Sequence, residues 1–125
     1  ADIGAFASTW SFHENDLIVL GSNDSDMAIA SNHLIKNQGG LVVVKSGKIL
    51  ASLPLQFGGI VSTDSFETVS SNFEKINNSI VDLGCKFTRP HLIPLFLPFL
   101  ALPSVRILAR GIIDVKKRSY ISPIN

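Results

Sequence analysis

The sequence predicts an α+β domain in which a mixed β-sheet carries two amphipathic helices on its faces. Two observations support this prediction. β-rich apolar segments occur near the N-terminus and at residues 41–53, and apolar residues recur with helical spacing over residues 24–38 and 64–83. At 125 residues the chain can bury one hydrophobic core but hardly two. We therefore expect a single domain over residues 1–125, built as a ββαββ unit followed by a helix and a C-terminal hairpin.

The first half of the chain contains the ββαββ unit. Apolar segments at residues 3–11 and 16–21, separated by a polar stretch, are typical of a β-hairpin. Helical spacing then begins, and its apolar face comprises Met27, Ala30, Ser31, Leu34 and Ile35. Asn23 or Asp24 can cap the start of this helix, and Gly39-Gly40 can form its left-handed exit.

A second hairpin completes this unit. Leu41–Val44 is an unbroken apolar run, which indicates a strand buried on both faces. Ser46-Gly47 is suited to a tight turn, after which Lys48–Leu53 pairs back with the preceding strand.

The second helix has the strongest periodicity in the chain. Its apolar stripe comprises Phe66, Val69, Phe73, Ile76, Ile80 and Leu83. Asp64 followed by Glu67 resembles a capping box, and Gly84 ends the run. We expect this stripe to pack on the sheet.

The C-terminal third begins with the apolar segment Leu92–Leu102, which contains Pro94 and Pro98. Proline excludes this segment from a central strand, and its length is far below the roughly 20 residues that cross a bilayer. We expect an extended segment wedged between layers or between domains. A final hairpin should follow, formed by Val105–Ala109 and Ile112–Val115.

The composition limits the classes of partner. Charged residues make up 17% of the chain, against about 25% in an average domain, and one explanation is that part of the surface is covered by something absent from this chain. A net charge of +1 gives no reason to expect nucleic acid. The single cysteine, Cys85, fits a reducing cytoplasmic setting and a buried structural thiol. Because the chain opens with Ala1, we expect it to be a piece of a longer protein.

Catalytic motifs are scarce. The three histidines, His13, His33 and His91, lie far apart in the sequence, and no pair has metal-ligand spacing, so no metal site is predicted. His33 is expected to face solvent and His91 to be a loop residue with satisfied hydrogen bonds. No nucleophile elbow or phosphate-binding glycine loop occurs.

Two polar groups are candidate sites. His13 with Glu14 and Asp16 is the densest ionisable cluster, suited either to proton transfer or to a polar hairpin tip. The strand-to-helix junction that contains Asn23 and Asp24 presents a helix N-terminus, which can bind a small polar ligand or a partner surface. These residues alone leave three functions open: part of an enzyme, a small-ligand binding module, or a self-association domain.

Several segments together resemble the C-terminal domain of bacterial and archaeal adenine deaminases, which belong to the amidohydrolase superfamily. In family order they are Gly4–Ser8, Leu17–Met27, Gly39–Val44, Gly47–Lys48, Leu53–Leu55, Gly59–Ser62, Leu83–Cys85, Phe99–Pro103 and Arg110–Val115. The resemblance covers nearly the whole chain. It implies a hydrolase of purine metabolism that converts adenine and water to hypoxanthine and ammonia.

In that family, an upstream (β/α)₈ barrel binds manganese or iron, and the metal activates the attacking water. The resemblance therefore implies that the metal ligands precede this chain, that the barrel of the same protein is its partner, and that the chain alone is inactive. The family usually carries His-Asp-Ser-His-Asn where this chain reads Phe12–Asp16, so neither family histidine is kept in place. Asn23 and Asp24 do match the family, and they join His13, Glu14 and Asp16 as substrate-proximal candidates. A homo-oligomer is compatible with this assignment.

Overall fold

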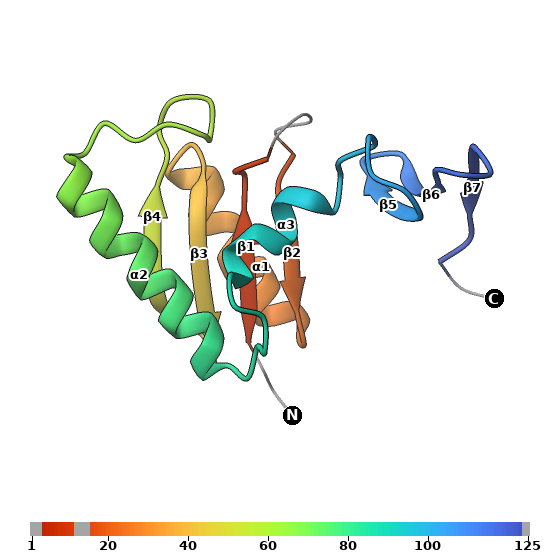
Figure 1. The fold of residues 1–125 in the computed structure, drawn as a ribbon. Helices are drawn as coiled ribbons and strands as arrows, with labels where there is room; N and C mark the ends of the chain where they lie inside the picture. The colour runs from red at the N-terminus through yellow and green to blue at the C-terminus, as the bar shows by residue number, and fades with distance from the viewer. Residues whose placement is uncertain (1–3, 12–15, 124–125) are drawn as a thin grey trace.

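The computed structural model describes residues 4–11 and 16–123 (Figure 1). Its α+β architecture confirms the expected class, with a ββαββ unit, a long helix and a C-terminal hairpin. The strands and helices, in chain order, are β1 (Ala5–Ser8), β2 (Ile18–Gly21), α1 (Asp24–Lys36), β3 (Gly40–Lys45), β4 (Lys48–Pro54), α2 (Phe66–Asp82), η1 (Pro90–Leu92), α3 (Ile93–Phe96), β5 (Val105–Leu108), β6 (Gly111–Asp114) and β7 (Ser119–Ile121).

The first four strands form one sheet, the main sheet, in the order β2-β1-β3-β4. All of its pairings are antiparallel, so the sheet that we expected to be mixed is antiparallel throughout the described strands. The reason is local: β1–β2 and β3–β4 are hairpins, and α1 returns the chain along the sheet so that β3 pairs antiparallel with β1.

The two long helices cover opposite faces of the main sheet, as predicted (Figure 1). Alternation along β1 and β3 directs successive side chains to the two faces. One cluster packs with α1 and contains Ala5, Ala7, Ala30, Leu34, Val42 and Val44. The other packs with α2 and contains Phe6, Leu41, Val43, Ala51, Leu53, Leu55, Ile76 and Ile80.

The helix starts correct one detail of the sequence interpretation. Asn23 caps α1, as one of the two expected alternatives, but α2 is capped by Ser65, whose hydroxyl accepts a hydrogen bond from the Thr68 N–H at 3.3 Å. Asp64 lies one residue too early to cap. Phe66 is the first residue of α2 and is 82% exposed, so the buried stripe begins at Val69 and not at Phe66.

The segment at residues 92–102 is not extended as predicted. It contains the end of η1 and the short helix α3, followed by turns. Proline occupies the first turn of each helix, where its missing N–H is not needed and its fixed φ favours helix. Pro94, Leu95 and Pro98 are buried, and η1 packs beside α2.

The C-terminal strands form a separate three-stranded antiparallel sheet, the C-terminal sheet, in the order β5-β6-β7. The hairpin β5–β6 was predicted, whereas β7 was not. Figure 1 shows this sheet projecting away from the main sheet and its helices. In the described part of the chain, no helix is both long and apolar enough to cross a membrane.

Candidate functional site

The structure divides the predicted site residues between the two ends of the main sheet. Asp16 precedes β2, whereas Asn23 and Asp24 follow it. The four residues of β2 span roughly 13 Å, so these groups do not converge on one small ligand. His13 and Glu14 lie outside the described residues.

At the end where β2 passes into α1, the polar side chains hold the fold together. The Asn23 side-chain oxygen accepts a hydrogen bond from the Asp26 N–H at 2.8 Å. The Asp26 carboxylate accepts from the backbone N–H groups of Ser46 and Gly47, at 2.9 and 2.7 Å, and from the Asn23 amide at 3.1 Å. Asp26 thereby ties the start of α1 to the β3–β4 turn.

These hydrogen bonds also set the ionisation of Asp26. The backbone hydrogen bond from Gly47 and the side-chain hydrogen bond from Asn23 lower the pKa of its carboxyl group, against the opposing effect of burial. Asp26 is therefore a buried carboxylate with a structural task, and it was missed by the sequence interpretation. In the sequence, its position in the first turn of a helix indicates only where that helix starts.

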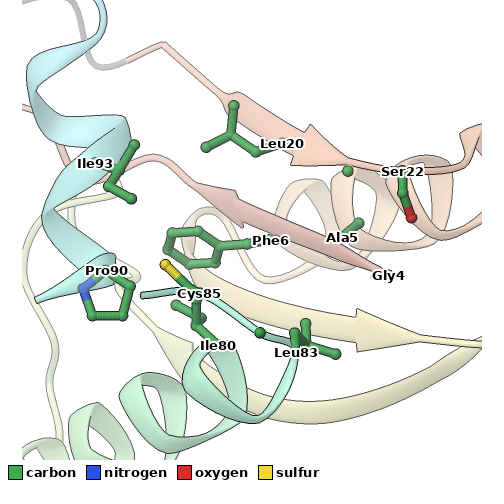
Figure 2. Close-up of a pocket in the computed structure, with 12 residues that line it drawn as sticks. Gly4, Ala5, Phe6, Leu20, Ser22, Ile80, Leu83, Cys85, Pro90 and Ile93 are labelled. Atoms are coloured by element: carbon green, nitrogen blue, oxygen red, sulfur yellow. The ribbon is translucent and has the colours of Figure 1, made fainter. Parts of the chain in front are cut away.

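An apolar hollow lies beside this junction, between the start of β1 and the end of α2 (Figure 2). Its volume is about 340 Å³, and it is lined by Gly4, Ala5, Phe6, Leu20, Gly21, Ser22, Ile80, Leu83, Gly84, Cys85, Pro90 and Ile93. No lining residue is charged, so the hollow suits an apolar group better than a polar ligand. Cys85, which we expected to be buried, is half-buried here and packs against the core cluster of Phe6 and Ile80.

At the end of the main sheet opposite the β2–α1 junction, three rings from distant segments form an aromatic cluster. The Trp10 ring stacks on His91 with centroids 6.2 Å apart and planes 20° apart, and Phe73 meets both rings edge-on at 5.5 Å. His91 Nδ1 lies 2.6 Å from Asn77 Oδ1. Because an amide oxygen only accepts, Nδ1 donates this hydrogen bond, and the lone pair of the neutral ring is on Nε2.

Burial, followed by the charge of Arg89, lowers the pKa of His91. The ring is therefore neutral at pH 7 and can accept a proton or a hydrogen bond through Nε2. The expected hydrogen bond of His91 is present, through Asn77, but the residue lies in the 3₁₀ helix η1 and not in a loop. The stacking on Trp10 was missed, because no local pattern connects positions 10, 73 and 91.

His33 has a structural role and, contrary to the expectation, does not face solvent. It is half-buried on α1, and its Nε2 atom lies 2.8 Å from Ser52 Oγ and 2.9 Å from Asn37 Nδ2. Burial, followed by the charge of Lys36, lowers the pKa of this ring. The pair with Ser52 fixes α1 to β4.

The donor chemistry of the described residues does not fit a catalytic metal. Among residues 4–11 and 16–123, no group of three or more histidine, cysteine, aspartate or glutamate side chains lies close enough together to hold an ion. The carboxylate with the most polar contacts, Asp26, is occupied by backbone N–H groups.

A protein-family model, described as the adenine deaminase C-terminal domain, matches residues 1–119 of the chain. The adenine deaminase of Cenarchaeum symbiosum is 57% identical over 124 residues, which are 99% of this chain and 20% of that protein. Those of Brucella abortus and Clostridium botulinum are 38% and 35% identical over 118 and 119 residues, again 20% of each protein. The chain thus spans about a fifth of the length of these curated relatives.

Proposed function

The chain belongs to the family of adenine deaminase C-terminal domains, and from this premise we propose that it is the C-terminal part of an enzyme that hydrolyses adenine to hypoxanthine and ammonia. One observation carries the proposal. Relatives named adenine deaminase match 94–99% of this chain, although the matched region is only 20% of each of them. A match of this extent at 57% identity is incompatible with a shared short motif.

We assign the chemistry to the remaining four-fifths of the enzyme. Manganese or iron, which the family resemblance implies, would activate the attacking water there. The described residues of this chain offer no ligand set for such an ion, and we route no step of the reaction through them. We further propose a cytoplasmic enzyme of purine catabolism, which is consistent with a chain that has a single cysteine.

The role of this chain, in our proposal, is to complete the enzyme's structure and to form part of the wall of the substrate pocket. Asp16 lies at the same end of the main sheet as Trp10, and we keep it, with His13 and Glu14, as substrate-proximal candidates. Asn23 and Asp24 lie at the other end, where Asn23 caps α1. We assign Asn23 to holding the fold, and we propose that Asp24, at the same end of the sheet, also lies away from adenine.

The test is an assay of the whole natural protein, purified with added manganese. We expect ammonia release and conversion of adenine to hypoxanthine, measured by ultraviolet absorbance. No turnover of adenine by the metal-loaded whole protein would refute the proposed activity. Turnover by the 125-residue chain alone would refute the assignment of the chemistry to the upstream part.

A further inference from the structure

Four large apolar side chains are exposed where β4 leads into α2. They are Phe57, Ile60, Val61 and Phe66, and we call them the 57–66 surface. Phe57 is 68% exposed and Phe66 is 82% exposed. Ile60, Val61 and Phe66 also line a hollow of about 410 Å³, which extends to Trp10 and Phe73 of the aromatic cluster. Large apolar side chains exposed together in this way mark an interaction site.

The backbone that presents this surface is fixed. Phe57 and Val61 exchange two backbone hydrogen bonds of 3.1 Å, which close the loop. The Thr9 hydroxyl donates to the Gly59 carbonyl at 2.8 Å and accepts from the Gly40 N–H at 2.8 Å, so the loop is bound to the main sheet. A Cβ atom at Gly59 would lie 2.7 Å from Thr9 Oγ1, so this approach requires glycine. The side chains are therefore displayed in a preorganised geometry, which lowers the entropic cost of binding.

The charges around this surface restrict its partner. Residues 49–74 contain no lysine or arginine, and the hollow is lined by one carboxylate, Asp64. A nucleic acid or an anionic membrane would require cations at such a site. The chemistry instead fits an apolar protein surface.

We propose that the 57–66 surface packs against the catalytic part of the same polypeptide, the portion that precedes residue 1 in an adenine deaminase. This inference rests on the proposed function. The curated relatives are about five times as long as the matched region, so the upstream part is the largest surface available to this domain. A tethered partner also acts at an effective concentration in the mM range, which favours it over a second copy of the chain.

The experiment uses the whole natural protein and three variants. Phe57→Asp and Phe66→Asp place a carboxylate in the 57–66 surface. Phe87→Asp is the matched control, because Phe87 is 66% exposed and follows the far end of α2, a helix about 25 Å long. In Phe66→Asp the new carboxylate falls in the first turn of α2, where negative charge stabilises a helix, so a loss of docking cannot be attributed to loss of the helix.

Hydrogen exchange of residues 55–66, measured by mass spectrometry, is the readout. We expect slow exchange in the wild-type protein at both low and high protein concentration. Exchange should be about tenfold faster in Phe57→Asp and Phe66→Asp, since each variant loses one aromatic side chain that the docked upstream part would bury. Phe87→Asp should leave this exchange unchanged. Unchanged exchange in the first two variants, or equal effects in all three, would overturn the inference. So would protection that disappears on dilution, which would assign the surface to a second copy.

Adenine turnover of the same wild-type sample separates the two proposals. An active enzyme with an unprotected 57–66 surface would overturn the docking and leave the activity standing. A protein with a protected surface that does not deaminate adenine would support the contact and refute the activity.

Discussion

The main sheet and the C-terminal sheet bury their apolar side chains to very different extents. In the main sheet, β3 contributes four consecutive buried apolar side chains, Leu41–Val44, covered by α1 on one face and α2 on the other. In the C-terminal sheet, the paired residues Ile107 and Ile112 and the next residue across, Ile121, share one face. None of these three is buried.

This difference separates a sheet that is stabilised by its own core from a sheet that is not. A sheet with helices on both faces carries its own core, whereas a small sheet without a covered face is marginal in water. The C-terminal sheet is connected to the rest of the chain by few contacts, among them a backbone hydrogen bond of 3.1 Å from Ile107 N–H to the Leu97 carbonyl. Within the described residues, no helix packs on it to the extent seen for the main sheet.

The largest expected effect comes from a substitution that creates a cavity in the main sheet's core. Ile76 is fully buried on α2, so Ile76→Ala should lower the free energy of unfolding by about 3–4 kcal/mol. Ile107→Ala, at an exposed position of the C-terminal sheet, should lower it by less than about 1 kcal/mol. Urea titration followed by the fluorescence of Trp10, the chain's single tryptophan, measures both. Equal losses would remove the distinction between the sheets.

Two glycines with nearly the same φ angle sharpen the comparison. Gly40 in β3 has φ 131° and Gly111 in β6 has φ 129°, both strained for alanine. A Cβ at Gly40 would overlap the Leu53 carbonyl oxygen, whereas at Gly111 the nearest atom is Tyr120 Cδ1 at 3.6 Å. We expect Gly40→Ala to cost about 2–3 kcal/mol and Gly111→Ala about 1 kcal/mol, measured by thermal unfolding. A Gly111→Ala variant as unstable as Gly40→Ala would show that the C-terminal sheet is coupled to the core.

The smallest effect, and the one that depends on pH, concerns Asp26. Hydrogen bonds from Gly47 and Asn23 lower the folded-state pKa of this carboxyl group from its ordinary value of 3.8. The charged form therefore stabilises the fold above about pH 4, and this contribution is lost as the pH falls through the lowered pKa. Asp26→Asn should be less stable than wild type at pH 7, and the gap should narrow below about pH 4. Denaturation midpoints at several pH values test this, and a gap that widens in acid would contradict it.

The sequence predicted those elements whose signals are local. The apolar periodicity of α2, the unbroken run of β3 and the glycines at turns all act within a few residues, and the structure has each element close to its expected bounds. The prediction of an extended segment at residues 92–102 was wrong. Its prolines were used only to exclude a central strand, although Pro94 occupies a first-turn position, where proline favours a helix. Strand β7 has only three residues and follows a polar turn, so it had no detectable pattern.

The candidate site was harder to predict, because its contacts join distant segments. The sequence placed Asp16, Asn23 and Asp24 within nine residues of one another, but β2 lies between them and separates their side chains. Conversely, Trp10 and His91 are 81 residues apart in the chain and stack in the structure. The exposed Phe66 shows a further limit: apolar spacing identifies the face of a helix, but not how far along that face the sheet extends.

The strand order has a consequence for synthesis of the protein. β1 is central in the main sheet, yet it leaves the ribosome before the other three strands of that sheet, and its second partner, β3, ends 37 residues after β1 does. At roughly 5–20 residues per second, one edge of β1 stays unpaired for about 2–7 seconds in each nascent chain. An open apolar strand edge can template aggregation during that interval. The time at which translation delivers β3 is therefore expected to set the yield of correctly folded protein.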